Sequence, residues 1–68
     1  MSKITERLKE LRFEKRLKQS EIAFELKVPE STYSNWEQGR SEPDISHLMT
    51  LAKFFSVTID YLVGFVES

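Results

Sequence analysis

The chain has 68 residues, of which 40% are apolar, and it contains two glycines, two prolines and no cysteine. This length suffices for one small domain, and the lack of cysteine excludes a disulfide framework and a thiolate metal site. The single histidine, His47, excludes the usual histidine-rich metal clusters, and we expect it on the surface. No apolar run is long enough to span a membrane, and the N-terminus lacks the apolar core of a signal peptide, so we expect a cytoplasmic protein.

The formal charge of −1 conceals a difference between the two ends of the chain. Residues 1–27 carry eight basic and five acidic side chains, for a net +3, whereas residues 41–68 carry one basic and four acidic side chains, for a net −3. Such polarity would let one face meet a polyanion while the other meets solvent or a partner. A solvated surface of mixed charge is the simpler alternative, and charge alone does not decide between the two.

Apolar residues at helical spacing predict two helices in the first half of the chain, over residues 4–16 and about 18–26. Phe13 and Phe24 lie off the apolar stripes of these helices. We favour the explanation that packing buries faces broader than one stripe; the alternative is that both rings form an exposed interaction patch. The stripes themselves consist of Ile4, Leu8 and Leu11 in the first helix and Ile22, Ala23 and Leu26 in the second.

A third helix is predicted over residues 30–38, after the turn Lys27-Val28-Pro29. Tyr33 and Trp36 are spaced three residues apart and should form its inner face. Gly39 is a suitable helix stop. The outer face then carries only short polar side chains and one longer amide, namely Ser31, Ser34, Asn35 and Gln38.

Two further helices are predicted over residues 45–55 and 59–63, with Asp44 and Thr58 as N-caps. No strand pattern competes with these helices, so we expect an all-α domain of five short helices over residues 1–68, with a core at 4–64 and a short tail at 65–68. The apolar stripe of the fourth helix consists of Ile45, Leu48, Leu51, Ala52 and Phe55.

The segment at about 19–38, two helices joined by a short turn with a small residue in the first, matches the helix-turn-helix pattern. The extended run resembles the XRE family, which includes the phage lambda and 434 repressors and Cro. The resemblance covers about residues 4–64 and implies a lambda-repressor-like domain that reads double-stranded DNA with its third helix. It rests on Leu17–Ala23, Val28, Ser31–Gly39, Pro43 and Leu51–Leu62.

The resemblance also implies roles for individual residues. Arg12 and Glu37 match an ion pair that ties the first helix to the third, and we expect this pair to orient the recognition helix. Base-reading positions fall on Glu30, Ser31, Ser34 and Asn35. Phosphate-contacting positions fall on Lys18, Gln19, Lys27, Thr32 and Arg40.

The sequence departs from the family pattern where glycine is usual, in the turn at Lys27 and after the first helix at Arg16. A left-handed non-glycine residue costs on the order of 1 kcal/mol. The usual Ser or Thr cap of the second helix is replaced by Lys18. Glu30 would accept a hydrogen bond from a cytosine amino group, or it only favours the helix N-terminus; both explanations stay open.

The C-terminal part has more apolar residues than a small domain needs, and we expect it to form a homodimer contact, as the family resemblance also suggests. The residues concerned are Ile59, Tyr61, Val63, Phe65 and Val66. The leading hypothesis is a repressor that binds an inverted-repeat operator as a dimer, without cofactor, metal or small-molecule effector. The alternative is a protein-interaction module or antitoxin-type partner with the same fold; an enzyme is not expected, because no nucleophile–base set is present.

Overall fold

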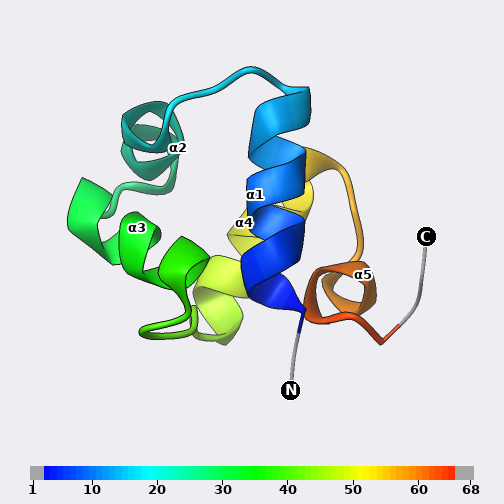
Figure 1. The fold of residues 1–68 in the computed structure, drawn as a ribbon. Coiled ribbons are helices and arrows are strands. Elements are labelled where there is room, and N and C mark those ends of the chain that lie inside the picture. Colours follow the sequence, from blue (N-terminus) through cyan, green and yellow to red (C-terminus); the bar gives the residue numbers. More distant parts are fainter. Residues whose placement is uncertain (1–2, 66–68) are drawn as a thin grey trace.

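The computed structural model describes residues 3–65, which form five helices connected by short turns. Along the chain these are α1 (Ile4–Glu14), α2 (Gln19–Leu26), α3 (Glu30–Gln38), α4 (Ile45–Phe55) and α5 (Ile59–Val63). The all-α class is confirmed, and the described residues contain no strand. In Figure 1, α2 and α3 lie together along one side of the molecule, and α5 lies beside the start of α1.

The core forms where the predicted inner faces meet. Leu8, Ile22, Tyr33, Leu51 and Leu62 are fully buried, one from each helix. In such a short chain each helix therefore contributes its one apolar stripe to a single shared core. The helix pairs in closest contact are α2 with α3 and α1 with α3.

Helix ends follow the expected capping chemistry at three places. The Asp44 side chain accepts a hydrogen bond from the His47 backbone N–H at 2.9 Å, and the Thr58 hydroxyl accepts one from the Tyr61 N–H at 3.0 Å. Gly39 ends α3 in the left-handed region with φ 78°. These local bonds satisfy backbone groups that a helix end leaves open.

Two boundary and burial predictions were wrong. Helix α1 ends at Glu14 rather than at residue 16, because Arg16 adopts φ 56° and turns the chain toward α2. Ile45 was assigned to the apolar stripe of α4 but is 68% exposed. It begins α4 ahead of the part that meets the core, and the preceding Pro43 is buried.

The favoured explanation for Phe13 and Phe24 was also wrong, because they are 64% and 81% exposed. Helix α2 packs its Ile22–Ala23–Leu26 stripe inward, and a five-helix domain has no element left to cover its outer side. The Phe13 ring is contacted by the Arg12 guanidinium, whose Cζ lies 4.7 Å from the ring centroid. Phe24 remains an unburied aromatic ring beside α4.

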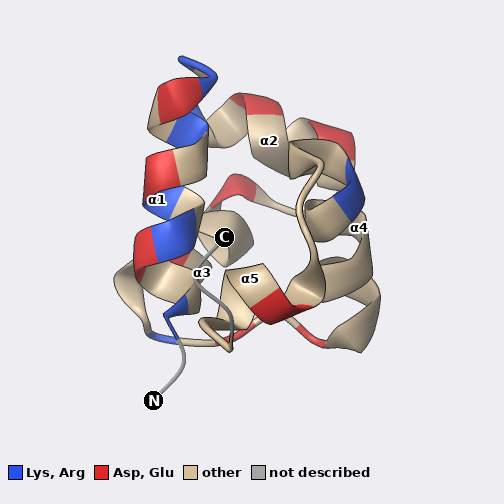
Figure 2. Ribbon diagram, turned by 90° about the vertical axis from the view of Figure 1, so that its right-hand side faces the viewer, with Lys and Arg blue, Asp and Glu red and all other residues tan. Residues whose placement is uncertain are grey.

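No helix of the described part of the chain is long and apolar enough to cross a membrane. Figure 2 shows basic and acidic residues interleaved along α1. Two basic side chains of the N-terminal half are also used inside the fold: Arg7 is buried with its guanidinium 4.0 Å from the Tyr61 ring centroid, and Arg12 is paired with Glu37. The net +3 of residues 1–27 is therefore not all available to a partner.

Candidate nucleic-acid interface

The turn between α2 and α3 depends on a left-handed residue at the position where the sequence lacks glycine. Lys27 adopts φ 60° and ψ 41°, as expected. Its N–H donates to the Phe24 carbonyl at 3.1 Å, and the Val28 N–H donates to the Ala23 carbonyl at 3.0 Å, which closes the end of α2. Pro29 then precedes α3 in an extended conformation, so the two helices diverge sharply.

Helix α3 separates its polar and apolar sides as predicted. Tyr33 and Trp36 are buried and pack edge to face, with ring centroids 5.9 Å apart. On the outer side Glu30 and Ser31 are exposed, whereas Ser34 is half-buried. Asn35 and Thr32 are half-buried too. The helix thus presents polar groups to the outside from a backbone that its inner face holds in place.

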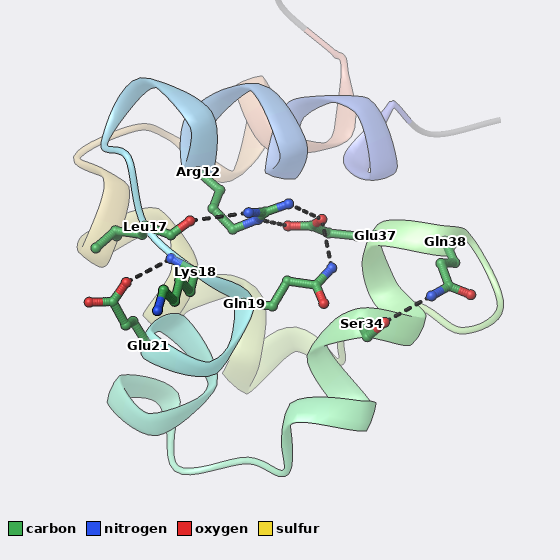
Figure 3. A network of polar contacts seen from close by, with 8 residues as sticks. All are labelled: Arg12, Leu17, Lys18, Gln19, Glu21, Ser34, Glu37 and Gln38. Atoms are coloured by element: carbon green, nitrogen blue, oxygen red, sulfur yellow. Dashed lines mark hydrogen bonds and ion pairs between the residues drawn. The ribbon is translucent and has the colours of Figure 1, made fainter.

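The Arg12–Glu37 ion pair is present and ties α1 to α3 (Figure 3). Arg12 Nε donates to Glu37 Oε2 at 2.7 Å, and Arg12 Nη2 donates to Glu37 Oε1 at 3.0 Å. The third guanidinium nitrogen, Nη1, donates to the Leu17 carbonyl at 3.1 Å, in the connection that leads into α2. A bidentate pair of this kind fixes direction as well as distance, since the guanidinium and the carboxylate lie fork to fork.

Gln19 belongs to the same network, a contact that the sequence did not predict. Its Nε2 donates to Glu37 Oε1 at 3.0 Å, so α2 is linked to the carboxylate that holds α3. The Glu37 side chain is only 3% exposed and that of Arg12 is 15% exposed. One buried carboxylate therefore joins α1, α2 and α3.

The titration of this network follows from its contacts. Burial alone would raise the pKa of Glu37, but the hydrogen bonds from Arg12 and Gln19 outweigh burial and hold that pKa below its ordinary value. The bond to Glu37 raises the pKa of Arg12. Burial raises the pKa of Tyr33, and the neighbouring Glu37 carboxylate raises it further. The Tyr33 hydroxyl is buried without a hydrogen-bond partner of good geometry among the described residues.

Most residues expected at phosphate positions lie at the start of α2 or in the connections on either side of α3, and Thr32 lies in α3 itself. Lys18, Lys27 and Arg40 are all exposed, and Arg40 follows directly after the Gly39 stop. The Lys18 N–H donates to Glu21 Oε1 at 2.7 Å, so a carboxylate from the first turn of α2 caps the backbone where the Lys18 side chain cannot. This bond is one half of a capping box; the other half, in which a Ser or Thr oxygen accepts from the Glu21 N–H, is missing because a lysine side chain cannot accept.

Two polar contacts near this surface were not predicted from the sequence. Gln38 Nε2 donates to Ser34 Oγ at 2.9 Å, which couples two exposed-side residues one turn apart (Figure 3). His47 is half-buried, with its ring centroid 5.2 Å from that of Trp36, and its Nδ1 lies 2.8 Å from Asp44 Oδ1. The spacing of Ser34 and Gln38 signalled their contact, but only packing placed His47 against α3.

The expected dimer residues differ in how much surface they offer. Phe65 is 81% exposed, whereas Ile59, Tyr61 and Val63 are half-buried. Val66 lies outside the described residues. Within the described part of the set, Phe65 therefore provides most of the free apolar surface.

Comparison with known proteins places this geometry in a family. Residues 8–62 match the family described as Helix-turn-helix. The chain is 42% identical over 59 residues to the HTH-type transcriptional activator BcrR of Enterococcus faecalis, covering 87% of this chain and 29% of the relative. It is 36% identical over 62 residues to the cryptic phage CTXphi transcriptional repressor RstR of Vibrio cholerae, covering 91% of this chain and 56% of the relative.

A solved structure agrees with the sequence relatives. The crystal structure of a transcriptional regulator from Listeria innocua superposes with a TM-score of 0.92 at 37% identity, covering all of this chain and 64% of that one. The chain thus spans between about a third and two thirds of the length of these three relatives. The matched residues include the whole of α2, the turn and α3, so the chain belongs to the XRE family of helix-turn-helix transcriptional regulators.

Proposed function

We propose that this chain binds duplex DNA in a sequence-specific manner, with α3 in the major groove, and thereby regulates transcription. The observation that carries the proposal is the division of α3 into a polar outer side and an inner side fixed by Tyr33, Trp36 and the Arg12–Glu37 pair. A major groove admits one helix and is read by side chains held in a defined direction. The membership of a family of transcriptional regulators, which is not an enzyme class, supports the same conclusion.

Base contacts are proposed for Glu30, Ser31, Ser34 and Asn35, all on the outer side of α3. Serine and asparagine can donate to and accept from base edges, whereas the Glu30 carboxylate only accepts and would suit a cytosine amino group. These side chains would determine the sequence preference.

Phosphate contacts are proposed for residues at the start of α2, in the connections on either side of α3 and in its first turn: Lys18, Gln19, Lys27, Arg40 and Thr32. Gln19 can serve this role while it holds Glu37, because its amide has a second N–H. The start of α2 also presents backbone N–H groups that favour an anion. A phosphate at this point would touch the same network that fixes α3.

We further propose that the protein acts as a cytoplasmic homodimer that represses transcription by occupying an inverted repeat, with no cofactor or small-molecule effector. Half-sites would lie about 34 Å apart, one turn of DNA. Exposed Phe65, with Ile59, Tyr61 and Val63 beside it, is the proposed contact between protomers. Relatives include proteins named as an activator and as a repressor, so the position of the operator relative to the promoter decides the direction of regulation.

The experiment is selection of binding sites from a random duplex library at moderate salt. An enriched inverted repeat supports a dimeric DNA reader, and a single enriched half-site supports a monomeric one. Ser31→Ala and Asn35→Ala should relax the preference at individual bases. Arg40→Ala should instead weaken binding to all sites alike, and the slope of log binding constant against log salt concentration should become shallower by about 0.9 per protomer. If no sequence is enriched and binding stays weak at low salt, the proposal is wrong and a protein-interaction module of the same fold replaces it.

A further inference from the structure

A groove on the outer side of α2 is not explained by DNA binding. Its volume is about 490 Å³, and it opens to solvent between α2 and the end of α4. Six residues line it: Leu17, Ser20, Glu21, Phe24, Glu25 and Phe54. None of them belongs to α3, and none is among the residues proposed to contact DNA.

The groove has an apolar floor and an exposed aromatic wall. Leu17 and Phe54 are half-buried and pack against the core, where Phe54 meets Phe55 edge to face at 5.1 Å. Phe24 stands over them with 81% of its surface exposed. A large aromatic ring this exposed, beside further apolar surface, is typical of an interaction site rather than of scattered surface residues.

The charge of the groove indicates what would occupy it. Glu21 and Glu25 lie one helical turn apart on α2, and none of the six lining residues is basic. Glu21 Oε1 accepts a hydrogen bond from the Lys18 N–H at 2.7 Å, which orders this carboxylate. No hydrogen bond or ion pair among residues 3–65 involves the Glu25 carboxylate. The apolar floor and the acidic rim are together complementary to a partner segment that carries apolar side chains flanked by cationic ones.

We propose that this groove binds an amphipathic helix of a partner protein, one that inserts large apolar side chains over Leu17 and Phe54 and sets Lys or Arg against Glu21 and Glu25. An apolar helix face laid into a groove between two helices is an established mode of peptide recognition. Because none of the six lining side chains is proposed to read bases, the partner would not compete with α3 for the major groove.

The test is an NMR titration of the ¹⁵N-labelled chain with a synthetic helical peptide that presents Leu and Phe one turn apart, flanked by Lys. Backbone signals of Ser20, Glu21, Phe24, Glu25 and Phe54 should shift. A matched peptide with Glu in place of Lys should bind more weakly by about threefold or more. A second matched peptide with Ala in place of Leu and Phe should leave the signals unmoved.

Variants of the protein locate the contact. Phe24→Ala should reduce the affinity for the Lys-flanked peptide roughly tenfold, and Glu25→Gln should reduce it about threefold. Both positions are exposed, so these variants should fold normally. The matched control is Ile45→Ala, which removes another exposed apolar side chain (68% exposed, against 81% for Phe24) outside the groove and should leave peptide binding unchanged.

Three outcomes would overturn the proposal: shifts absent from the groove, equal affinity for the Glu-flanked peptide, or unchanged affinity in Phe24→Ala. Concentration-dependent self-association that Phe24→Ala abolishes would also overturn it, since a second copy of the chain would then be the occupant. The selection of DNA sites by Phe24→Ala should match that of the wild type, so failure of the groove and failure of DNA binding are distinguished.

Discussion

Removing Arg12 should destabilise the domain far more than removal of an ordinary surface arginine. In Arg12→Ala the Glu37 carboxylate, 3% exposed, loses both of its guanidinium bonds and keeps the bond from Gln19. The Leu17 carbonyl loses its donor as well. Breaking a buried pair from one side costs about 3–5 kcal/mol, because an uncompensated charge stays behind. We expect the lower end, about 3 kcal/mol, since Gln19 remains and the Arg12 side chain is itself 15% exposed.

This loss is large for so small a domain. A chain of 68 residues has a total stability of about 3–10 kcal/mol, so Arg12→Ala should be partly unfolded or close to it at room temperature. Urea unfolding followed by circular dichroism measures the change, and the melting temperature should fall by roughly 12–24 °C. Arg12→Lys, which keeps the charge but not the bidentate geometry, should lie between Arg12→Ala and the wild type.

A double variant separates orientation from stability. Arg12→Met with Glu37→Leu removes both charges and should recover most of the lost stability, since apolar replacements of buried pairs are often neutral or better. If the pair orients α3, this stable double variant should still bind DNA with reduced sequence preference. A loss below about 1 kcal/mol in Arg12→Ala would refute the reasoning, because Glu37 would then not depend on its partner.

Three further predictions follow from individual contacts. The folded state lowers the pKa of Glu37, so the stability that this carboxylate contributes is present above its unfolded pKa of about 4.3 and is lost as the pH falls through the folded pKa. The urea midpoint should therefore fall more between pH 7 and pH 3 in the wild type than in the Arg12→Met, Glu37→Leu variant. Lys27→Gly should raise the melting temperature by roughly 2–8 °C, from about 0.5–1 kcal/mol of relieved left-handed strain, while weakening DNA binding, and a lower melting temperature would contradict this. Ser34→Ala and Gln38→Ala should give non-additive losses of DNA affinity in a double-mutant cycle, because Gln38 holds the Ser34 oxygen and directs its O–H outward; additive losses would show that the two residues act separately.

Local sequence determined most of the scaffold. Helix ends were predictable at Asp44, Thr58 and Gly39 because capping depends on a side chain or a glycine within the same turn. The left-handed turn at Lys27 and the division of α3 into two sides followed in the same way, from residue spacing and from the family resemblance. The Arg12–Glu37 pair was expected from that resemblance and is present.

Tertiary structure decided which side of each helix stays open. The position of Phe24 off the apolar stripe left open whether its ring would be buried, because that depends on how many neighbouring helices are available to cover it. The burial of Arg7 against Tyr61 and of His47 against Trp36 likewise depends on segments far apart in the chain. Helical periodicity states which residues share a face, whereas burial is a property of the partner that a face meets. The fold and the two sides of α3 therefore followed from local residue spacing, whereas the groove beside Phe24 depends on the packing of α2 against α4.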